Sequence, residues 1–124
     1  SIVEREAYYR SDMPRIASVF LNRLKSRAFP YLESDATVKY IKLLSGDTGA
    51  PTAADIDALE NSYNTYKTKG LPPGAICSPG YDAILSVIRP AETDYYYFVS
   101  AKDKTTVFSK TYAEHLKAVA ALKS

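Results

Sequence analysis

Apolar residues recur at helical spacing at the very start of the chain. Ile2, Val3, Glu6 and Ala7 follow the i, i+1, i+4, i+5 spacing of one helix face, which predicts a short helix with a glutamate in its apolar stripe. Glu4 lies about 200° around the same helix from Glu6. We therefore expect the two glutamates to face different environments.

A longer helix is predicted next, because its apolar residues keep the helical period over several turns. Ser11 or Asp12 can cap this helix, and Pro14 suits its first turn. Its apolar face is formed by Ile16, Ala17, Phe20, Leu21 and Leu24.

The remaining elements are shorter helices and one β-hairpin. The helices are expected over residues 36–41, 55–59, 83–87 and 112–122. Thr52 can start the second of these helices, and Pro90 lies just beyond the third. Aromatic and β-branched residues at 95–100 and 105–109 flank a polar turn at 101–104, which is typical of a hairpin. This order of elements predicts an α+β fold.

Residues 64–80 form the least regular stretch of the chain. Three prolines and three glycines among these seventeen residues exclude a continuous helix or strand, because proline fixes φ and glycine readily adopts positive φ. Leu71–Gly74 is expected to be a stiff extended piece closed by a turn, and Ser78–Gly80 repeats the device. Rigid loops of this kind commonly carry binding or catalysis, although a well-fixed connection is the alternative.

Composition narrows the class of protein. A chain of 124 residues with 46% hydrophobic content suits one domain around a single core. The net charge of +2 is too small to indicate a nucleic-acid-binding surface. One cysteine, Cys77, excludes an internal disulfide, and the single histidine, His115, leaves no cluster spaced like a metal site. We expect no metal and no organic cofactor.

The sequence also bears on the relation to membranes. Its apolar runs fall well short of the ~20 residues that span a bilayer, so the chain as given is expected to be soluble. It begins inside a predicted helix, and we expect it to be a piece of a longer protein.

Glu6 is the strongest candidate for chemistry. A carboxyl in an apolar helical stripe is desolvated, which raises its pKa toward the range that a general acid needs. The alternative is a structural ion pair with Arg10, four residues on. Glu33 and Asp35 add two carboxyls in a predicted turn, where Ser34 or Asp35 can also simply cap the next helix.

Aromatic content is the remaining feature with chemical meaning. The chain has eleven tyrosines and no tryptophan, and tyrosine suits both the faces and hydroxyls of sugar rings and ordinary cores. The tyrosines closest to Glu6 or to the irregular loop are Tyr8, Tyr9, Tyr63 and Tyr66. Cys77 is expected to be a small buried filler and His115 to lie on a helix face, so no catalytic triad is indicated.

Five blocks along the chain carry a resemblance to a known family. The blocks are Ser1–Glu6, Ala17–Leu24, Ser34–Val38, Tyr63–Tyr66 and Gly70–Gly80. Together, and in this order, they resemble the YceG-like family, the MltG-type endolytic murein transglycosylases. Tyr97–Val99, Phe108 and Glu114–His115 extend the similarity to the last predicted helix, so the resemblance covers essentially the whole chain.

The resemblance implies a bacterial enzyme of cell-wall assembly. Such an enzyme cuts within peptidoglycan strands, between N-acetylmuramic acid and N-acetylglucosamine, and leaves a 1,6-anhydro end without using water. The implied fold is a lysozyme-like helical catalytic domain with a small antiparallel hairpin, here residues 1–124. The family also implies a membrane anchor and a LysM-like subdomain N-terminal to this chain, a location on the extracytoplasmic face of the bacterial cell membrane, and peptidoglycan synthases as partners.

The resemblance also implies site residues. The essential glutamate of the family matches Glu6, which periodicity selects independently. One carboxyl can serve both steps, because the 6-hydroxyl of the sugar replaces water: Glu6 protonates the leaving oxygen and then accepts a proton. Residues expected to bind or orient the sugar, or to stabilise its developing charge, are Ser34, Asp35, Asn64, Thr65, Tyr66 and Glu33.

Three positions depart from the family pattern. Ala36 stands where proline is usual, Glu33 where glutamine is common, and Ala7 where threonine or serine follows the glutamate. The loss of a hydroxyl at Ala7 is expected to reduce activity or to alter the substrate.

The alternative function is a non-catalytic peptidoglycan-binding module. In that protein Glu6 would be only structural, and a buried Glu6–Arg10 pair without a cleft would favour it over an enzyme.

Overall fold

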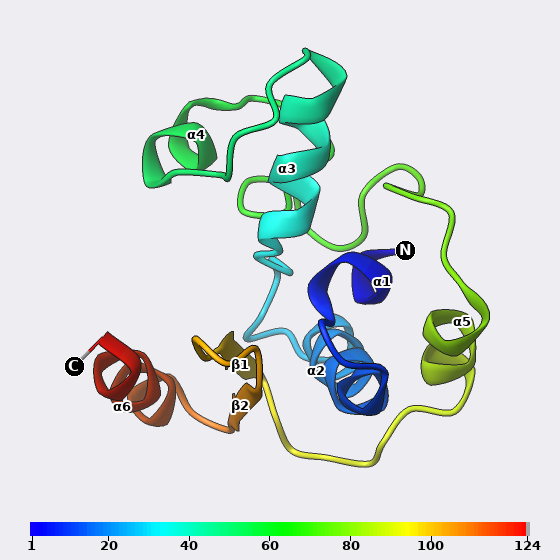
Figure 1. Ribbon diagram of the computed structural model, residues 1–124, viewed down its shortest axis with the longest axis vertical. Helices are drawn as coiled ribbons and strands as arrows, with labels where there is room; N and C mark the ends of the chain where they lie inside the picture. Colours follow the sequence, from blue (N-terminus) through cyan, green and yellow to red (C-terminus); the bar gives the residue numbers. More distant parts are fainter. Residues whose placement is uncertain (124) are drawn as a thin grey trace.

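The computed structural model describes residues 1–123 and has the predicted α+β fold (Figure 1). The helices are α1 (Ile2–Glu6), α2 (Met13–Lys25), α3 (Asp35–Leu44), α4 (Ala53–Ala58), α5 (Tyr81–Ile88) and α6 (Tyr112–Lys123). The two strands are β1 (Tyr97–Ser100) and β2 (Thr106–Ser109), and a 3₁₀ turn, η1, spans Arg10–Asp12. Residues 64–80 contain no helix or strand, which confirms the predicted irregular loop.

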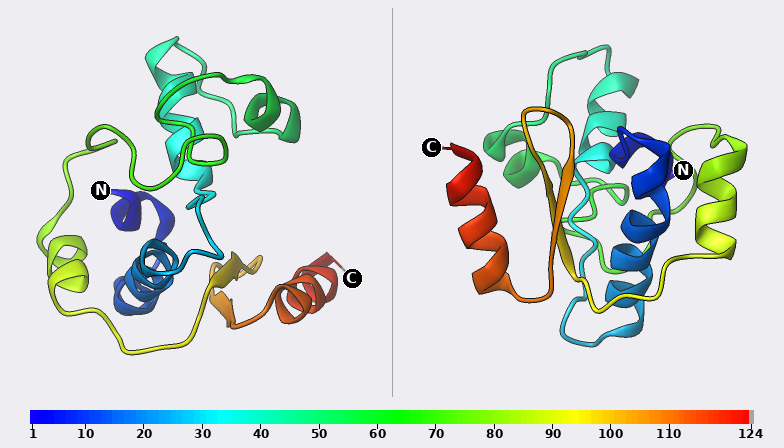
Figure 2. Two further views of the ribbon diagram at one scale, coloured as in Figure 1. Left: turned by 180° about the vertical axis from the view of Figure 1, so that it is seen from behind. Right: turned by 60° about the horizontal axis from the view of Figure 1, so that its bottom comes forward.

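Helix α2 is the central element of the fold. Helices α1 and α5 pack against it, and in both views of Figure 2 the hairpin lies between α2 and α6. The buried core cluster consists of Ile2, Val3, Met13, Ile16, Ala17, Phe20, Leu32, Ile76 and Ala83. Ile76 belongs to the irregular loop, and its N–H donates to Ser1 Oγ at 3.1 Å, so the loop is fixed against α1. Cys77 is partly exposed rather than buried, and its thiol donates to the Ser1 carbonyl at 3.4 Å.

The hairpin is shorter than the sequence predicts. Strands β1 and β2 pair antiparallel with Tyr97 opposite Ser109. The predicted strand began at residue 95, but two side chains of α2 take the carbonyl groups there. Asn22 donates to the Tyr95 carbonyl at 3.0 Å and Arg23 to the Tyr96 carbonyl at 2.7 Å. Helix α6 packs against both strands. Within the described residues, none of the helices combines the length and apolar character needed to cross a membrane.

Helix capping agrees with prediction at one helix and departs from it at two. Thr52 starts α4 through a capping box with Asp55. Asp12 and Ser34 occupy the N-cap positions of α2 and α3, but neither side chain caps its helix. Asp12 contacts Arg15 at 2.6 Å instead. The Ser34 hydroxyl is thereby available to a residue outside its own helix.

Candidate active site

Glu6 is the last residue of α1, and its carboxyl group faces the start of α3. Its Oε1 accepts hydrogen bonds from Ser34 Oγ at 3.2 Å and from the Ala36 N–H at 3.1 Å. The alternative prediction, a structural ion pair between Glu6 and Arg10, is wrong. The Arg10 guanidinium lies 3.5 Å from the Asp82 carboxylate instead. Among the described residues, both hydrogen bonds to the carboxyl end on the same oxygen, which leaves Oε2 for another partner.

The environment of Glu6 favours its protonated form. Burial raises the pKa of Glu6 from an ordinary 4.5 to about 7, and the nearby Asp35 charge adds to this rise. The hydrogen bonds from Ala36 and Ser34 oppose the rise, because they stabilise the carboxylate. A carboxyl that titrates near neutrality can both give and take a proton. Glu4, in contrast, accepts the backbone N–H of Gly80 at 2.6 Å, so the two glutamates face different environments as predicted.

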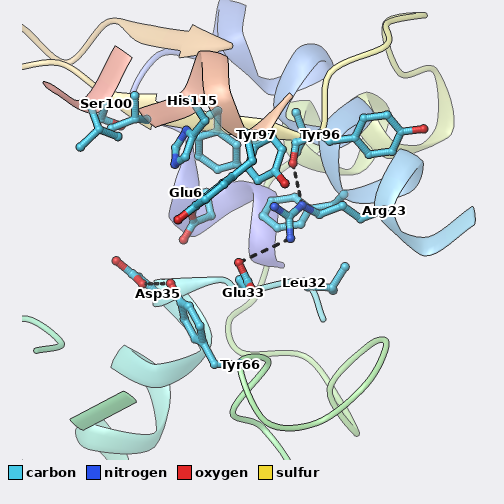
Figure 3. A pocket seen from close by; sticks show the side chains of 16 residues that line it. Glu6, Arg23, Leu32, Glu33, Asp35, Tyr66, Tyr96, Tyr97, Ser100 and His115 are labelled. Atoms are coloured by element: carbon cyan, nitrogen blue, oxygen red, sulfur yellow. Dashed lines mark hydrogen bonds and ion pairs between the residues drawn. The ribbon is translucent and has the colours of Figure 1, made fainter. Parts of the chain in front are cut away.

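A cavity of about 400 Å³ opens beside Glu6 (Figure 3). Polar and aromatic side chains that line it include Arg23, Glu33, Asp35, Tyr66, Tyr97 and His115. A second hollow of about 300 Å³ also includes Glu6 and Asp35 in its lining, together with Arg5, Lys39 and Tyr40. Glu6 and Asp35 therefore line both hollows.

Asp35 and Tyr66 form a hydrogen-bonded pair on one side of the cavity. The Tyr66 hydroxyl donates to Asp35 Oδ1, and Figure 3 shows the pair across the cavity from His115 and Tyr97. Burial raises the pKa of the Tyr66 hydroxyl above its ordinary value, and the bond to Asp35 raises it further. The phenol thus stays protonated and orients the Asp35 carboxylate toward the same space as Glu6.

Arg23 joins the two walls of the cavity. Besides its bond to Tyr96, the buried guanidinium donates to the Tyr31 carbonyl at 3.0 Å and lies 3.8 Å from the Glu33 carboxylate. It also lies over the Tyr97 ring, 5.0 Å from its centroid. One cation from α2 therefore fixes β1 relative to the turn that precedes α3.

Asn64 and Thr65 lie behind the cavity wall. Both side chains are fully buried. The Asn64 amide donates to the carbonyls of Ile56 and Leu59 at 3.0 and 2.9 Å, and Thr65 Oγ1 accepts the Ser34 N–H at 2.9 Å. Neither residue is among those that line the cavity. Their hydrogen bonds support the turn that carries Ser34.

Sequence reasoning did not bring Arg23, Tyr97 and His115 to this site. A signal existed for Arg23, because it follows Ile16 and Phe20 at helical spacing and is thus a cation in an apolar stripe. His115 gave no comparable signal, since its neighbours come from the packing of α6 on the hairpin.

The arrangement as a whole can move a proton and hold a polar chain. Glu6 can donate and accept the proton, Asp35 and Glu33 supply negative charge, and Tyr66 supplies a hydrogen bond. Within residues 1–123, no group of three or more His, Cys, Asp or Glu side chains is arranged to hold a metal ion.

Comparisons with known proteins identify the family. The chain is 41% identical over 118 residues to an endolytic murein transglycosylase of Bacillus subtilis, covering 95% of this chain and 31% of that protein. It is 39% identical over 102 residues to an endolytic murein transglycosylase of Streptococcus pneumoniae, covering 81% of this chain and 18% of that protein. The crystal structure of a yceG-like protein from Listeria monocytogenes matches with a TM-score of 0.83 and 40% identity, over 95% of this chain and 37% of the other.

The chain thus spans about a third or less of the length of the curated relatives that it matches. The sequence model of the YceG-like family matches residues 1–121, nearly the entire chain. On this match and these identities, the chain belongs to the YceG-like family.

Proposed function

We propose that this chain is the catalytic part of an endolytic murein transglycosylase. It would cut the bond between N-acetylmuramic acid and N-acetylglucosamine without water and leave a 1,6-anhydro end. The observation that carries the proposal is Glu6, a residue that lines two hollows and whose carboxyl has its pKa raised by burial to about 7. The names of the Bacillus subtilis and Streptococcus pneumoniae relatives support the same activity.

The first step is protonation of the leaving sugar. Ser34 and Ala36 both donate to Glu6 Oε1, so the carboxyl proton resides on Oε2, the oxygen without these donors. Oε2–H gives this proton to the glycosidic oxygen as the bond from that oxygen to C1 of the muramic acid breaks. The leaving group departs as a free hydroxyl, and C1 carries oxocarbenium-like positive charge.

The second step closes the anhydro ring. The 6-hydroxyl of the same sugar attacks C1 and gives its proton back to Glu6 Oε2, so the enzyme returns to its starting state. Ordinary glycosidases need a second carboxylate as nucleophile or as base for water. Here an internal hydroxyl takes the place of water, and one carboxyl with a pKa near neutrality serves both steps.

The other residues of the site have supporting roles in this mechanism. The Asp35 carboxylate, oriented by Tyr66, stabilises the positive charge that develops on the sugar. Glu33 lines the same cavity, and its carboxylate also stabilises positive charge on the sugar. Ser34, Asn64 and Thr65 act from inside the protein, because their buried side chains hold Glu6 or the turn beside it.

Two features of the geometry agree with cutting inside a long strand by a lysozyme-like domain. Glu6 lines both hollows, which gives a glycan room on either side of the bond that is cut. A glutamate at the end of a helix faces a cavity between helices and a small β-hairpin, which is the arrangement expected of a lysozyme-like catalytic domain.

The proposal also covers the longer protein of which this chain would be the catalytic part. The Bacillus subtilis relative is about three times as long as the matched region, which covers 31% of it. We infer a membrane anchor and a LysM-like subdomain in the remaining sequence, a location on the extracytoplasmic face of the bacterial cell membrane, and peptidoglycan synthases as partners.

Mass spectrometry of digested peptidoglycan tests the proposed activity. The chain should release products with anhydro ends, each lighter by one water than a hydrolysed product. Glu6→Gln should release none, whereas Glu4→Gln, on the same helix but outside both hollows, should retain the activity. Hydrolysed ends would contradict the anhydro chemistry. Glycan binding without any product from the unmodified chain would favour the binding module instead.

A further inference from the structure

Tyr97 and His115 form a stacked pair of rings on the wall of the cavity. Tyr97 comes from β1 and His115 from α6, and their ring centroids are 5.1 Å apart with an interplanar angle of 22°. Tyr112 borders the pair, with its centroid 5.8 Å from Tyr97 and 6.4 Å from His115. Figure 3 shows the His115 ring pointing into the cavity above Glu6. The mechanism above uses none of these rings.

The imidazole of His115 has an unsatisfied ring nitrogen within residues 1–123. Its Nδ1 is buried and unpartnered among the described residues, and no side-chain hydrogen bond fixes the ring. A charged imidazolium would bury an additional unpaired donor, and burial together with the Arg23 charge lowers the pKa of His115 accordingly. The neutral ring with its proton on Nε2 avoids an unpaired buried N–H at Nδ1. Nε2–H is then a free donor at the edge of the ring.

The position of the pair determines what this donor can meet. On the opposite side of the cavity from the Tyr97–His115 pair lie Asp35 and Tyr66, which already form a hydrogen bond with each other. A neutral chain that enters the cavity therefore meets an aromatic wall that carries the His115 donor. Sugar rings match this surface, because they combine apolar faces with ring and hydroxyl oxygens and, in N-acetylhexosamines, an acetamido carbonyl.

We propose that Tyr97 and His115 form a binding subsite for the N-acetylhexosamine unit next to the bond that Glu6 cleaves, with His115 Nε2–H donating to an oxygen of that sugar. The inference rests on the proposed function, since it presupposes a glycan in the cavity. It adds to that function a contact from α6, the last helix of the chain, to the reacting part of the strand.

The single histidine of the chain makes the subsite directly observable. In Glu6→Gln, which keeps the cavity but removes the acid, long-range ¹H–¹⁵N NMR spectra report only the His115 ring nitrogens. A soluble peptidoglycan tetrasaccharide is added to this variant, and the ring signals are followed to saturation. We expect the free ring to carry its proton on Nε2 and the Nε2 signals to shift as the sugar binds. Signals that stay unchanged at saturation overturn the subsite.

Three further variants are made in the Glu6→Gln background. Their binding constants separate the contribution of the aromatic ring from that of its hydrogen-bond donor. His115→Phe keeps a flat ring without the donor and should weaken binding about threefold to tenfold, the range expected for one neutral hydrogen bond. His115→Ala loses both and should weaken it about tenfold or more. Lys117→Ala, exposed on the same helix, should bind like its parent. Circular dichroism checks the fold of each variant, and if the alanine variant does not fold, the phenylalanine variant decides.

The outcomes distinguish this inference from the proposed function. If the unmodified chain releases anhydro ends but His115→Phe binds the tetrasaccharide like its parent, the subsite is wrong and the function stands. If the unmodified chain neither cleaves peptidoglycan nor binds the tetrasaccharide, both are wrong.

Discussion

Replacing the proposed acid by its neutral isostere should make the protein more stable above neutral pH. Glu6 is protonated in the folded protein up to about pH 7, whereas an unfolded chain ionises an ordinary glutamate near 4.5. When Glu6 ionises in the folded protein above pH 7, it therefore places a charge where burial disfavours it. Glu6→Gln removes this charge, and its amide oxygen can still accept the hydrogen bonds from Ser34 and Ala36.

The size and sign of this effect follow from linkage. A rise in pKa from 4.5 to about 7 corresponds to about 3 kcal/mol, at about 1.36 kcal/mol for each pKa unit. Below pH 4.5 the carboxyl is protonated in both states, and Glu6→Gln should match the unmodified protein. As pH rises from 4.5 to 7, the unfolded chain loses its proton first and the unmodified protein loses stability relative to the variant. Above pH 7 the advantage of Glu6→Gln should level off at up to about 3 kcal/mol.

Urea denaturation at a series of pH values from 4 to 9 measures this difference directly. The matched control is Glu92→Gln, which changes an exposed carboxyl and should stay within about 0.5 kcal/mol of the unmodified protein throughout. A difference between Glu6→Gln and the unmodified protein that does not vary with pH would refute a raised pKa at Glu6. A variant that is less stable above pH 7 would show that the carboxylate, and not the neutral acid, is the form that the fold favours.

Three other substitutions test separate parts of the site. Ser34→Ala removes a donor that stabilises the carboxylate, so the pKa of Glu6 should rise above about 7 and the acid form should persist to higher pH in the pH profile of kcat/KM. Tyr66→Phe releases Asp35 and should lower kcat/KM about tenfold with little change in the urea midpoint, as measured by product release and denaturation. Asn64→Ala removes the donor to two partly buried carbonyls and should destabilise the fold by about 1–3 kcal/mol in urea denaturation, whereas a lower affinity with normal stability would contradict its supporting role.

Local sequence patterns predicted the elements well where a single period governs them. Helix α2 and the hairpin follow from apolar and aromatic spacing, and the prolines and glycines of residues 64–80 exclude regular structure there. Element ends were less predictable, because side chains from other elements determine them. The hairpin loses its first two predicted residues to Asn22 and Arg23, which lie more than seventy positions earlier in the chain.

The candidate site divides in the same way. Periodicity alone selected Glu6, because a carboxyl in an apolar stripe is desolvated by whichever element packs on that stripe. The hydroxyl of Ser34 had two local uses, as a helix cap or as a free side chain, and its sequence position does not choose between them. Packing of α1 against the start of α3 brings that hydroxyl to Glu6, 28 residues away.

What the sequence by itself determined is the set of local elements and the one carboxyl placed to be desolvated. Only the tertiary structure decided which groups surround that carboxyl. They are the donors from Ser34 and Ala36, the Asp35–Tyr66 pair, and the stacked rings of Tyr97 and His115. The physical reason is the distance along the chain over which each kind of interaction acts. Backbone propensity and periodicity act over a few residues, whereas these contacts join distant segments and form only when the core has closed around α2.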